Sequence, residues 1–176
     1  MPWAHISTKL SANTEPVRIF VSQTTSILTN YVGERGLKDK YILENREDIE
    51  TALFSYISTS HLNTVRIEVF NQSDDLAAVE WGDFQIDTVS PDNFRKRQEA
   101  EFDKIQENMM GKLHKLDPLP SDAKYRVLLS IGNENEFGQP PASLKGWAET
   151  TPRSPPESAN VDKDDRQSGL TWITLL

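Results

Sequence analysis

The last eight residues of the chain read GLTWITLL, and about twenty polar residues rich in Pro, Ser and Asp precede them. An apolar, strand-forming segment of this kind has to be buried, either against its own domain or against a partner. Burying each large side chain is worth roughly 1.5–3 kcal/mol, while ordering the polar residues costs roughly 1–2 kcal/mol of backbone entropy each. Because these opposing terms are similar in size, the tail can alternate between docked and undocked states. A permanently docked edge strand is the simpler interpretation of the same pattern.

Length and charge limit the classes of protein that fit the chain. The 176 residues suffice for one domain with a hydrophobic core. The net charge of −8 and the pI of about 4.9 argue against direct binding of nucleic acid or of an anionic membrane, both of which need clustered Lys and Arg. The absence of cysteine excludes disulfides, cysteine nucleophiles and cysteine-ligated zinc. The opening residues MPWAHISTKL carry no signal-peptide pattern, and no apolar run approaches the roughly 20 residues that span a bilayer. We therefore expect a cytoplasmic protein.

Helical periodicity predicts three helices. The first runs from about Glu15 to Tyr31, with Thr14 as its N-cap, and the second runs from Asn45 to Ser58 with Asn45 as its own cap. The third is long and charged on one side. It begins at Ser90-Pro91 and ends near Leu116.

Alternating apolar residues predict the strands. A short strand is expected within residues 1–10, a hairpin over residues 65–87 turns at NQSDD, and a further strand covers Tyr125 to Ile131. The alternation changes phase near Gly82, which predicts a bulge there. Hairpin-linked strands and amphipathic helices favour an α+β fold with a central antiparallel sheet and three helices packed on one face.

Motifs for catalysis or metal binding are not found in the sequence. His5, His61 and His114 are scattered and lack metal-ligand spacing. Asp83 and Asp87 fall on the same face of a predicted strand, where a site for a hard cation is one interpretation and a solvated strand face is the simpler one. No phosphate-binding glycine loop or nucleophile elbow is present. The sequence therefore predicts no catalytic residue, no metal and no cofactor.

Longer strings carry a family resemblance. The run NREDIETALFSYISTSHLNTVRIEVFNQSDDLAAVEWGDFQID resembles the second helix and hairpin of bacterial HORMA domain proteins. LPSDAKYRVLL and the later GW, followed by a loop rich in Thr, Pro, Arg and Ser, resemble the strand after the long helix and the C-terminal "safety belt" of that family. The resemblance spans roughly residues 10–176 and implies a protein that is not an enzyme.

The resemblance also implies a mechanism and partners. HORMA domains adopt open and closed topologies, and the closed form wraps its safety belt around a short closure-motif peptide, which adds as a strand beside the strand after the long helix. In the bacterial anti-phage operons that signal through cyclic oligonucleotides (CBASS), the closed protein binds and activates a cGAS/DncV-like nucleotidyltransferase. An AAA+ ATPase engages the N-terminus and reopens the domain. A second HORMA protein, or another copy that docks through the apolar tail, is a further expected partner.

The resemblance assigns these roles to particular residues. We expect a single domain over residues 1–176, with an N-terminal segment 1–12, a safety belt 132–176 and a polar linker 150–169 inside the belt. The residues expected to bind the closure peptide are Phe102, Ile105, Met109, Tyr125, Val127, Leu129 and Ile131. Those expected to anchor the belt are Gly146, Trp147, Leu170, Trp172, Ile173 and Leu175, and those expected to engage the ATPase are Trp3, His5 and Ile6.

Two functions from other classes remain open at this level. An acidic antitoxin or immunity protein would also carry an apolar tail after a polar linker, but its tail would block a partner's active site. A metal-dependent hydrolase built on Asp83 and Asp87 is the other alternative. What the tail contacts distinguishes the switch from the antitoxin.

Overall fold

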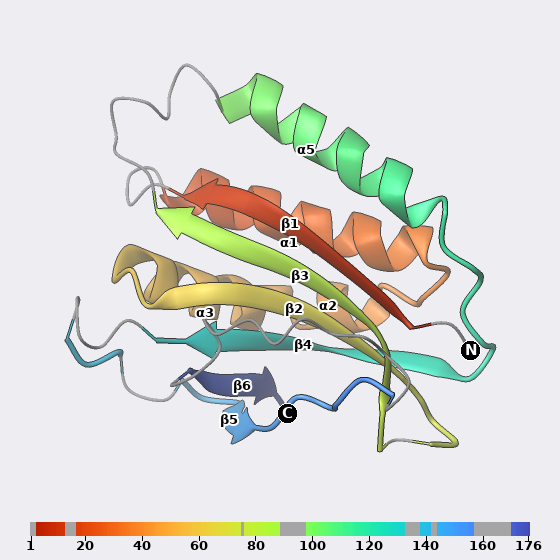
Figure 1. Cartoon of the computed structure of the whole chain (residues 1–176). Helices are drawn as coiled ribbons and strands as arrows, with labels where there is room; N and C mark the ends of the chain where they lie inside the picture. The colour runs from red at the N-terminus through yellow and green to blue at the C-terminus, as the bar shows by residue number, and fades with distance from the viewer. Residues whose placement is uncertain are drawn as a thin grey trace.

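The computed structural model describes residues 3–12, 17–74, 76–88, 98–132, 138–141, 144–156 and 170–176. They contain a six-stranded sheet with the strand order β1-β3-β2-β4-β6-β5 (Figure 1). The strands are β1 (Ala4–Ala12), β2 (Leu62–Asn71), β3 (Ala78–Thr88), β4 (Ala123–Ile131), β5 (Trp147–Thr150) and β6 (Thr171–Leu175). The helices are α1 (Val17–Glu34), α2 (Lys40–Glu44), α3 (Arg46–Ser58) and α5 (Gln98–Leu113).

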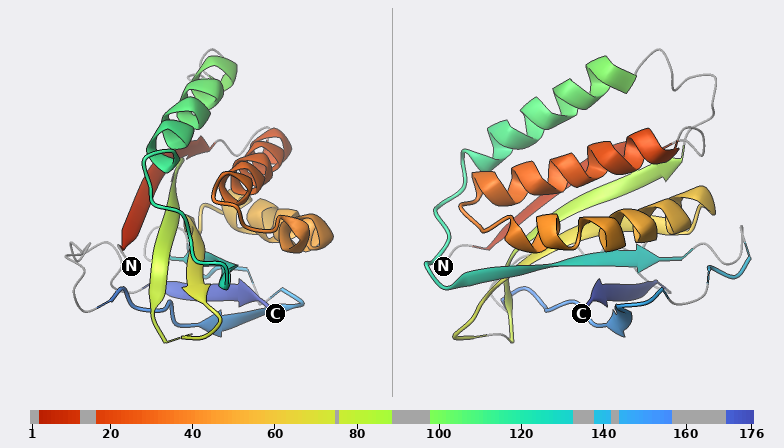
Figure 2. Two further views of the ribbon diagram at one scale, coloured as in Figure 1. Left: turned by 90° about the vertical axis from the view of Figure 1, so that its right-hand side faces the viewer. Right: turned by 180° about the vertical axis from the view of Figure 1, so that it is seen from behind.

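Helices α1, α2 and α3 cover one face of the sheet, and α5 lies beside α1 over β1 (Figure 2). The main hydrophobic core lies between these helices and the sheet. Alternate residues of β2 and β4 enter it, since successive strand residues point to opposite faces. We call the other side of the sheet the helix-free face. The core residues that β2 and β4 supply are Leu62, Val65, Ile67, Val69, Val127, Leu129 and Ile131.

Strand β3 is continuous through Gly82, so the predicted bulge at this glycine is wrong. The shift in register against β2 falls instead between Val69 and Phe70. Gly82 faces α1, and a Cβ atom there would lie 2.5 Å from Cζ of Tyr31. The Tyr31 hydroxyl donates to the buried Glu80 carboxylate at 2.7 Å. The absence of a side chain at Gly82 therefore lets α1 pack directly on the sheet.

The α+β class is confirmed, but the sheet is mixed rather than antiparallel, because β1 runs parallel to β3. Three helices separate β1 from β2 in the sequence, which gives the chain room for this crossover. The first helix, the second helix and the hairpin form where predicted. The predicted starts of the first and third helices, Thr14 and Ser90-Pro91, lie outside the described residues.

Asn45 does not cap the second helix with its side chain, contrary to the prediction. Its amide donates to the Tyr41 carbonyl oxygen at 2.8 Å. The reason is α2, a five-residue helix that the sequence analysis does not predict and that ends directly before Asn45. The Asn45 side chain therefore bonds back to α2 instead of to the first turn of α3.

Candidate functional site

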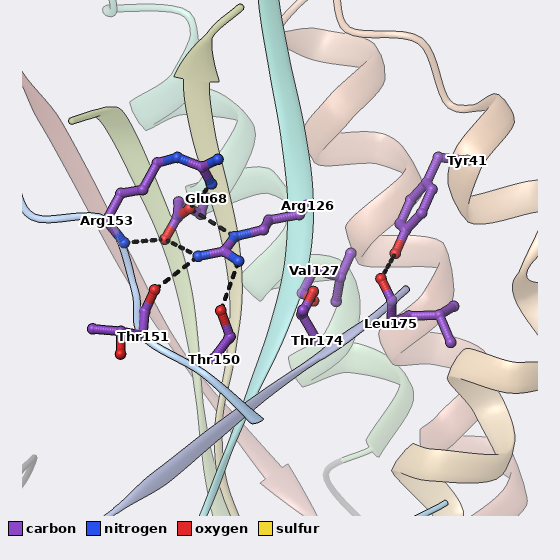
Figure 3. Close-up of polar contacts among 9 residues, drawn as sticks. All are labelled: Tyr41, Glu68, Arg126, Val127, Thr150, Thr151, Arg153, Thr174 and Leu175. Carbon is purple, nitrogen blue, oxygen red and sulfur yellow. Dashed lines mark hydrogen bonds and ion pairs between the residues drawn. The ribbon is translucent and has the colours of Figure 1, made fainter. Parts of the chain in front are cut away.

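The edge of β4 at which the resemblance implies a peptide strand is filled by β6, a later strand of the same chain. β6 pairs antiparallel with Leu128–Ile131. The Thr174 hydroxyl donates to the Val127 carbonyl oxygen at 3.0 Å, and Figure 3 shows the two residues together. Leu170 packs against Gly132, where a Cβ atom would collide with Cδ2 of the leucine. The residue before β6 therefore also packs closely against the residue after β4.

On the helix side, β5 and β6, which we call the belt strands, are held by apolar burial. Ile173, Leu175 and Trp147 belong to the main core. The Tyr41 hydroxyl, from α2, donates to the Leu175 carbonyl oxygen at 3.2 Å (Figure 3). Burial raises the pKa of Tyr41, so the phenol keeps the proton that this bond requires. Both belt strands thus contribute to the core that the helices share with the sheet.

On the helix-free face, β6 meets a buried arginine. Arg66 of β2 has no exposed surface and grips Asp83 of β3 with two bonds, Nε to Oδ1 at 2.6 Å and Nη2 to Oδ2 at 2.8 Å. Its guanidinium carbon lies 3.7 Å from the ring centroid of Trp81 and 4.5 Å from that of Trp172. Nε2 of His5 lies 2.7 Å from Oδ2 of Asp83. We call Arg66, Asp83 and Trp81 the Arg66 site.

The Arg66 site is electrostatically balanced. Burial raises the pKa of Asp83, but hydrogen bonds from His5 and Arg66 and the charge of Arg66 more than offset this effect. The pKa of Asp83 therefore lies below its ordinary value. The carboxylate stays ionised and neutralises Arg66, which a buried cation requires.

A second buried carboxylate on the helix-free face, Glu68, binds two arginines (Figure 3). Arg126 Nε donates to Glu68 Oε1 at 2.8 Å, and Arg153 donates to Glu68 from Nη1 and from its backbone N–H, each at 2.7 Å. Arg126 also donates to the Thr150 hydroxyl and the Thr151 carbonyl oxygen, both at 2.9 Å. We call Glu68, Arg126 and Arg153 the Glu68 cluster. It fastens the chain that leaves β5 to the helix-free face.

Residues 151–156, which we call the strap, run across that face. The Arg153 guanidinium lies 3.8 Å from the ring centroid of Phe70 in β2. Ser154 forms a parallel bridge with Ala77, just before β3, and its carbonyl oxygen accepts from Ala78 N–H at 3.0 Å. The strap therefore contacts the helix-free face of the sheet, while β5 and β6 form one edge of the sheet and contribute to the core on the helix side.

The predicted peptide-binding residues do not form one groove in this arrangement. Tyr125, Val127, Leu129 and Ile131 lie on β4, whereas Phe102, Ile105 and Met109 lie on α5. α5 packs on α1 and β1, and two strands separate β1 from β4 (Figure 1). The expectation that the helix stripe lies behind β4 is therefore wrong for this arrangement, because residues 114–122 carry the chain across the end of the sheet. Tyr125 donates through its hydroxyl to the Lys38 carbonyl oxygen at 2.7 Å.

The predicted ATPase residues lie at the other edge of the sheet. Ile6 packs against the main core, while Trp3 and His5 meet Trp81 edge-on, at ring-centroid distances of 5.0 and 5.6 Å. His5 and Trp172 thus belong to the opposite ends of the chain and both contact the Arg66 site. Sequence reasoning does not anticipate this meeting.

Sequence reasoning also misses the four charged residues that contact β6, the end of β5 and the strap: Arg66, Glu68, Arg126 and Arg153. The available signal is that Arg66 and Glu68 alternate along one strand with the apolar residues Val65, Ile67 and Val69. Read as one half-buried face, this alternation predicts solvent contact for both. Their partners lie on other strands and in the strap, far away in the sequence, so no local spacing of residues connects them.

The described residues offer no other chemistry of note. They contain no group of three or more His, Cys, Asp or Glu that could hold a metal ion. Asp83, a candidate cation ligand, is committed to Arg66, and the side chain of Asp87 lies outside the described residues. Within the part of the chain that the structure describes, every helix is too short or too polar to cross a membrane. No protein-family model and no curated protein matches this chain. The proposal for the function therefore rests on the contacts that β5, β6 and the strap make with the rest of the sheet.

Proposed function

We propose that this protein is a strand-exchange switch that binds a peptide at the edge of β4. In the resting form β6 fills the edge, and in the bound form a peptide strand replaces it. The observation that carries the proposal is the docking of β6 on Leu128–Ile131 after a thirteen-residue interval, 157–169, in the sequence. Such an interval allows β6 to leave β4 while Leu128–Ile131 stay paired with β2.

The energetics of β6 favour exchange. β2 pairs with β4 along its whole length, whereas β6 pairs with only Leu128–Ile131 of β4 and, on its other side, with the short strand β5. Burying Trp172, Ile173 and Leu175 stabilises the docked form by roughly 5–9 kcal/mol. Ordering residues 170–176 costs roughly 7–14 kcal/mol of backbone entropy. Because these ranges overlap, the hydrogen bonds and the belt contacts decide whether β6 is docked, and a strand that makes the same contacts competes with it.

The resemblance to HORMA domain proteins gives this exchange a role. We propose that the peptide-bound form activates a cGAS/DncV-like nucleotidyltransferase in anti-phage signalling, and that an AAA+ ATPase acting on residues 1–12 resets it. Two observations support this role. The tail contacts its own sheet, which favours a switch over an antitoxin. His5 and Trp172 share the Arg66 site, so a pull on β1 disturbs a partner of β6.

Hydrogen exchange on the full-length chain tests the exchange step. The ligand is a synthetic peptide of residues 170–176 with two added lysines for solubility, and the control peptide carries Ile173→Asp. We expect the peptide to accelerate exchange at the amides of β6 while Leu128–Ile131 stay protected, and the control to do neither. If β6 and β4 exchange together at every peptide concentration, β6 is a permanent edge strand and the proposal fails.

Purification from the native host tests the role. The wild-type chain should retain a nucleotidyltransferase or an AAA+ ATPase, and full-length Ile173→Asp, which cannot bury its new carboxylate in the core, should change the amount retained. Recovery of a single small toxin by both chains would identify the antitoxin class instead.

A further inference from the structure

We infer that the β4 edge selects its peptide by an aromatic side chain that stacks on Arg66. This inference rests on the proposed strand exchange and names the ligand class: an extended strand with the pattern aromatic, aliphatic, Ser or Thr, aliphatic. The aromatic residue takes the place of Trp172, opposite Ser130.

The Arg66 site does not depend on β6 for its shape. Arg66 and Asp83 come from β2 and β3, and their two hydrogen bonds fix the plane of the guanidinium. Cζ of Arg66 lies 3.7 Å from the ring centroid of Trp81 and 4.5 Å from that of Trp172. When β6 leaves, Trp172 leaves with it, and a planar cation remains that has lost one of its two aromatic contacts. Stacking of an aromatic ring is the contact that such a surface favours.

β6 is an imperfect occupant of this edge. Nη1 of Arg66, Nε1 of Trp81 and the Ser130 hydroxyl are all buried, and none has a hydrogen-bond partner among the described residues. All three belong to residues of the Arg66 site or of its surroundings on the helix-free face: Ser130 pairs with Trp172, and the rings of Trp81 and Trp172 both contact the Arg66 guanidinium. Buried donors without acceptors are costly. β6 therefore leaves buried polar atoms of this face unsatisfied, which lowers the stability of its docked form.

The remaining positions of the pattern follow from the other contacts of β6. Ile173 and Leu175 enter the core on the helix side, so the strand needs aliphatic residues at these two places. Thr174 donates to the Val127 carbonyl oxygen at 3.0 Å, which calls for a small hydroxyl. Selection therefore acts on both faces of the incoming strand, and the aromatic position is the one set by charge.

A peptide series on the full-length wild-type chain tests the inference. The peptide of residues 170–176 with two added lysines is compared with its Trp172→Phe, Trp172→Leu and Trp172→Ala forms by fluorescence anisotropy of an attached dye. We expect the Trp and Phe peptides to bind at least about tenfold more tightly than the Leu peptide, which keeps apolar burial but cannot stack. The Ala peptide should bind more weakly than all of them.

A matched variant separates stacking from general hydrophobicity. In full-length Arg66→Met/Asp83→Leu the buried ion pair is replaced by apolar residues of similar volume, a change that folded proteins often tolerate. The preference for Trp over Leu should fall to within about threefold in this variant. Tight binding of the Leu peptide to the wild-type chain, equal to that of Trp, would overturn the inference and leave the strand exchange intact. Failure of every peptide to bind and to accelerate exchange at β6 would overturn both.

Discussion

Replacing Glu68 by Gln removes the carboxylate that holds Arg126 and Arg153 together, while the shape of the side chain changes little. The wild-type carboxylate accepts from both guanidinium groups and from the Arg153 backbone N–H. A glutamine has one acceptor oxygen, and its amide N–H₂ must then face an arginine that also only donates. The Glu68→Gln variant therefore loses at least one charge-assisted bond and gains a contact between donors.

The magnitude follows from burial. Glu68 has no exposed side-chain surface, whereas Arg126 is 21% exposed and Arg153 is 20% exposed. A hydrogen bond to a charged group contributes about 1.5–3 kcal/mol, and water can rehydrate part of each released arginine. We expect the free energy of unfolding to fall by about 2–4 kcal/mol, short of the roughly 3–5 kcal/mol seen when a fully buried pair is broken. For a chain of this size that corresponds to about 4–16 °C in melting temperature.

Urea denaturation and hydrogen exchange together check this prediction. Exchange at the strap should accelerate in Glu68→Gln, because the Arg153 amide donates to the carboxylate that is lost. The control is Glu50→Gln, which breaks an exposed ion pair with Arg46 within α3. Such pairs contribute about 0.3–0.5 kcal/mol. If the two variants lose the same stability, or if the strap stays equally protected in both, the Glu68 cluster does not hold the belt.

Two further predictions concern the sheet itself. Gly82→Ala should lower the free energy of unfolding by about 1–3 kcal/mol, since its Cβ would meet the Tyr31 ring at 2.5 Å. The control is Gly111→Ala in α5, whose Cβ meets nothing within 4 Å and which should raise the free energy of unfolding by about 0.5–1 kcal/mol. Equal urea midpoints for the two variants would contradict the packing of α1 on Gly82. Although burial raises the pKa of Asp83, its bonds to His5 and Arg66 keep it below the unfolded value of about 3.9, so its contribution is complete above that pH and is lost as pH falls through the folded pKa. The free energy of unfolding should therefore fall less steeply in Asp83→Asn below about pH 4, and an unchanged slope would remove Asp83 from the acid transition.

Periodicity in the sequence is enough to predict α1, α3, the β2–β3 hairpin and β4. Each of these elements has a face that is buried in the main core, and one-sided burial leaves a period of 3.6 or 2 in the sequence. The place of α5 is a different matter. Its apolar stripe shows that one side is buried, but it does not say that the partners are α1 and β1 rather than β4. The parallel pairing of β1 with β3 is unpredictable for the same reason.

The helix-free face escapes prediction because its burial depends on distant chain. Arg66 and Glu68 alternate with Val65 and Ile67, which indicates a solvated face when β2 is considered alone. In the structure both charged residues are fully buried. Arg153, which binds Glu68, follows it by 85 residues, and no local pattern connects them.

The pairing of β5 with β6 also constrains how the proposed exchange would proceed. β5 takes its place in the sheet through β6, with which it pairs from Trp147 to Thr150. Once β6 leaves, the backbone groups of β5 lose their partner in the sheet, while Arg126 still holds Thr150 and Thr151. Release of β6 therefore requires the contacts of Ile173, Leu175 and Trp172 to break, whereas release of the strap requires the ionic contacts of Glu68 to break as well. A peptide in place of β6 has to match both the core side and the Arg66 side of the edge, and under the proposed exchange this double requirement provides specificity. In the proposed switch, the strap contacts that remain after β6 leaves keep the chain beside the sheet, and this supports our proposal that an ATPase working on the chain, rather than dilution of the ligand, resets it.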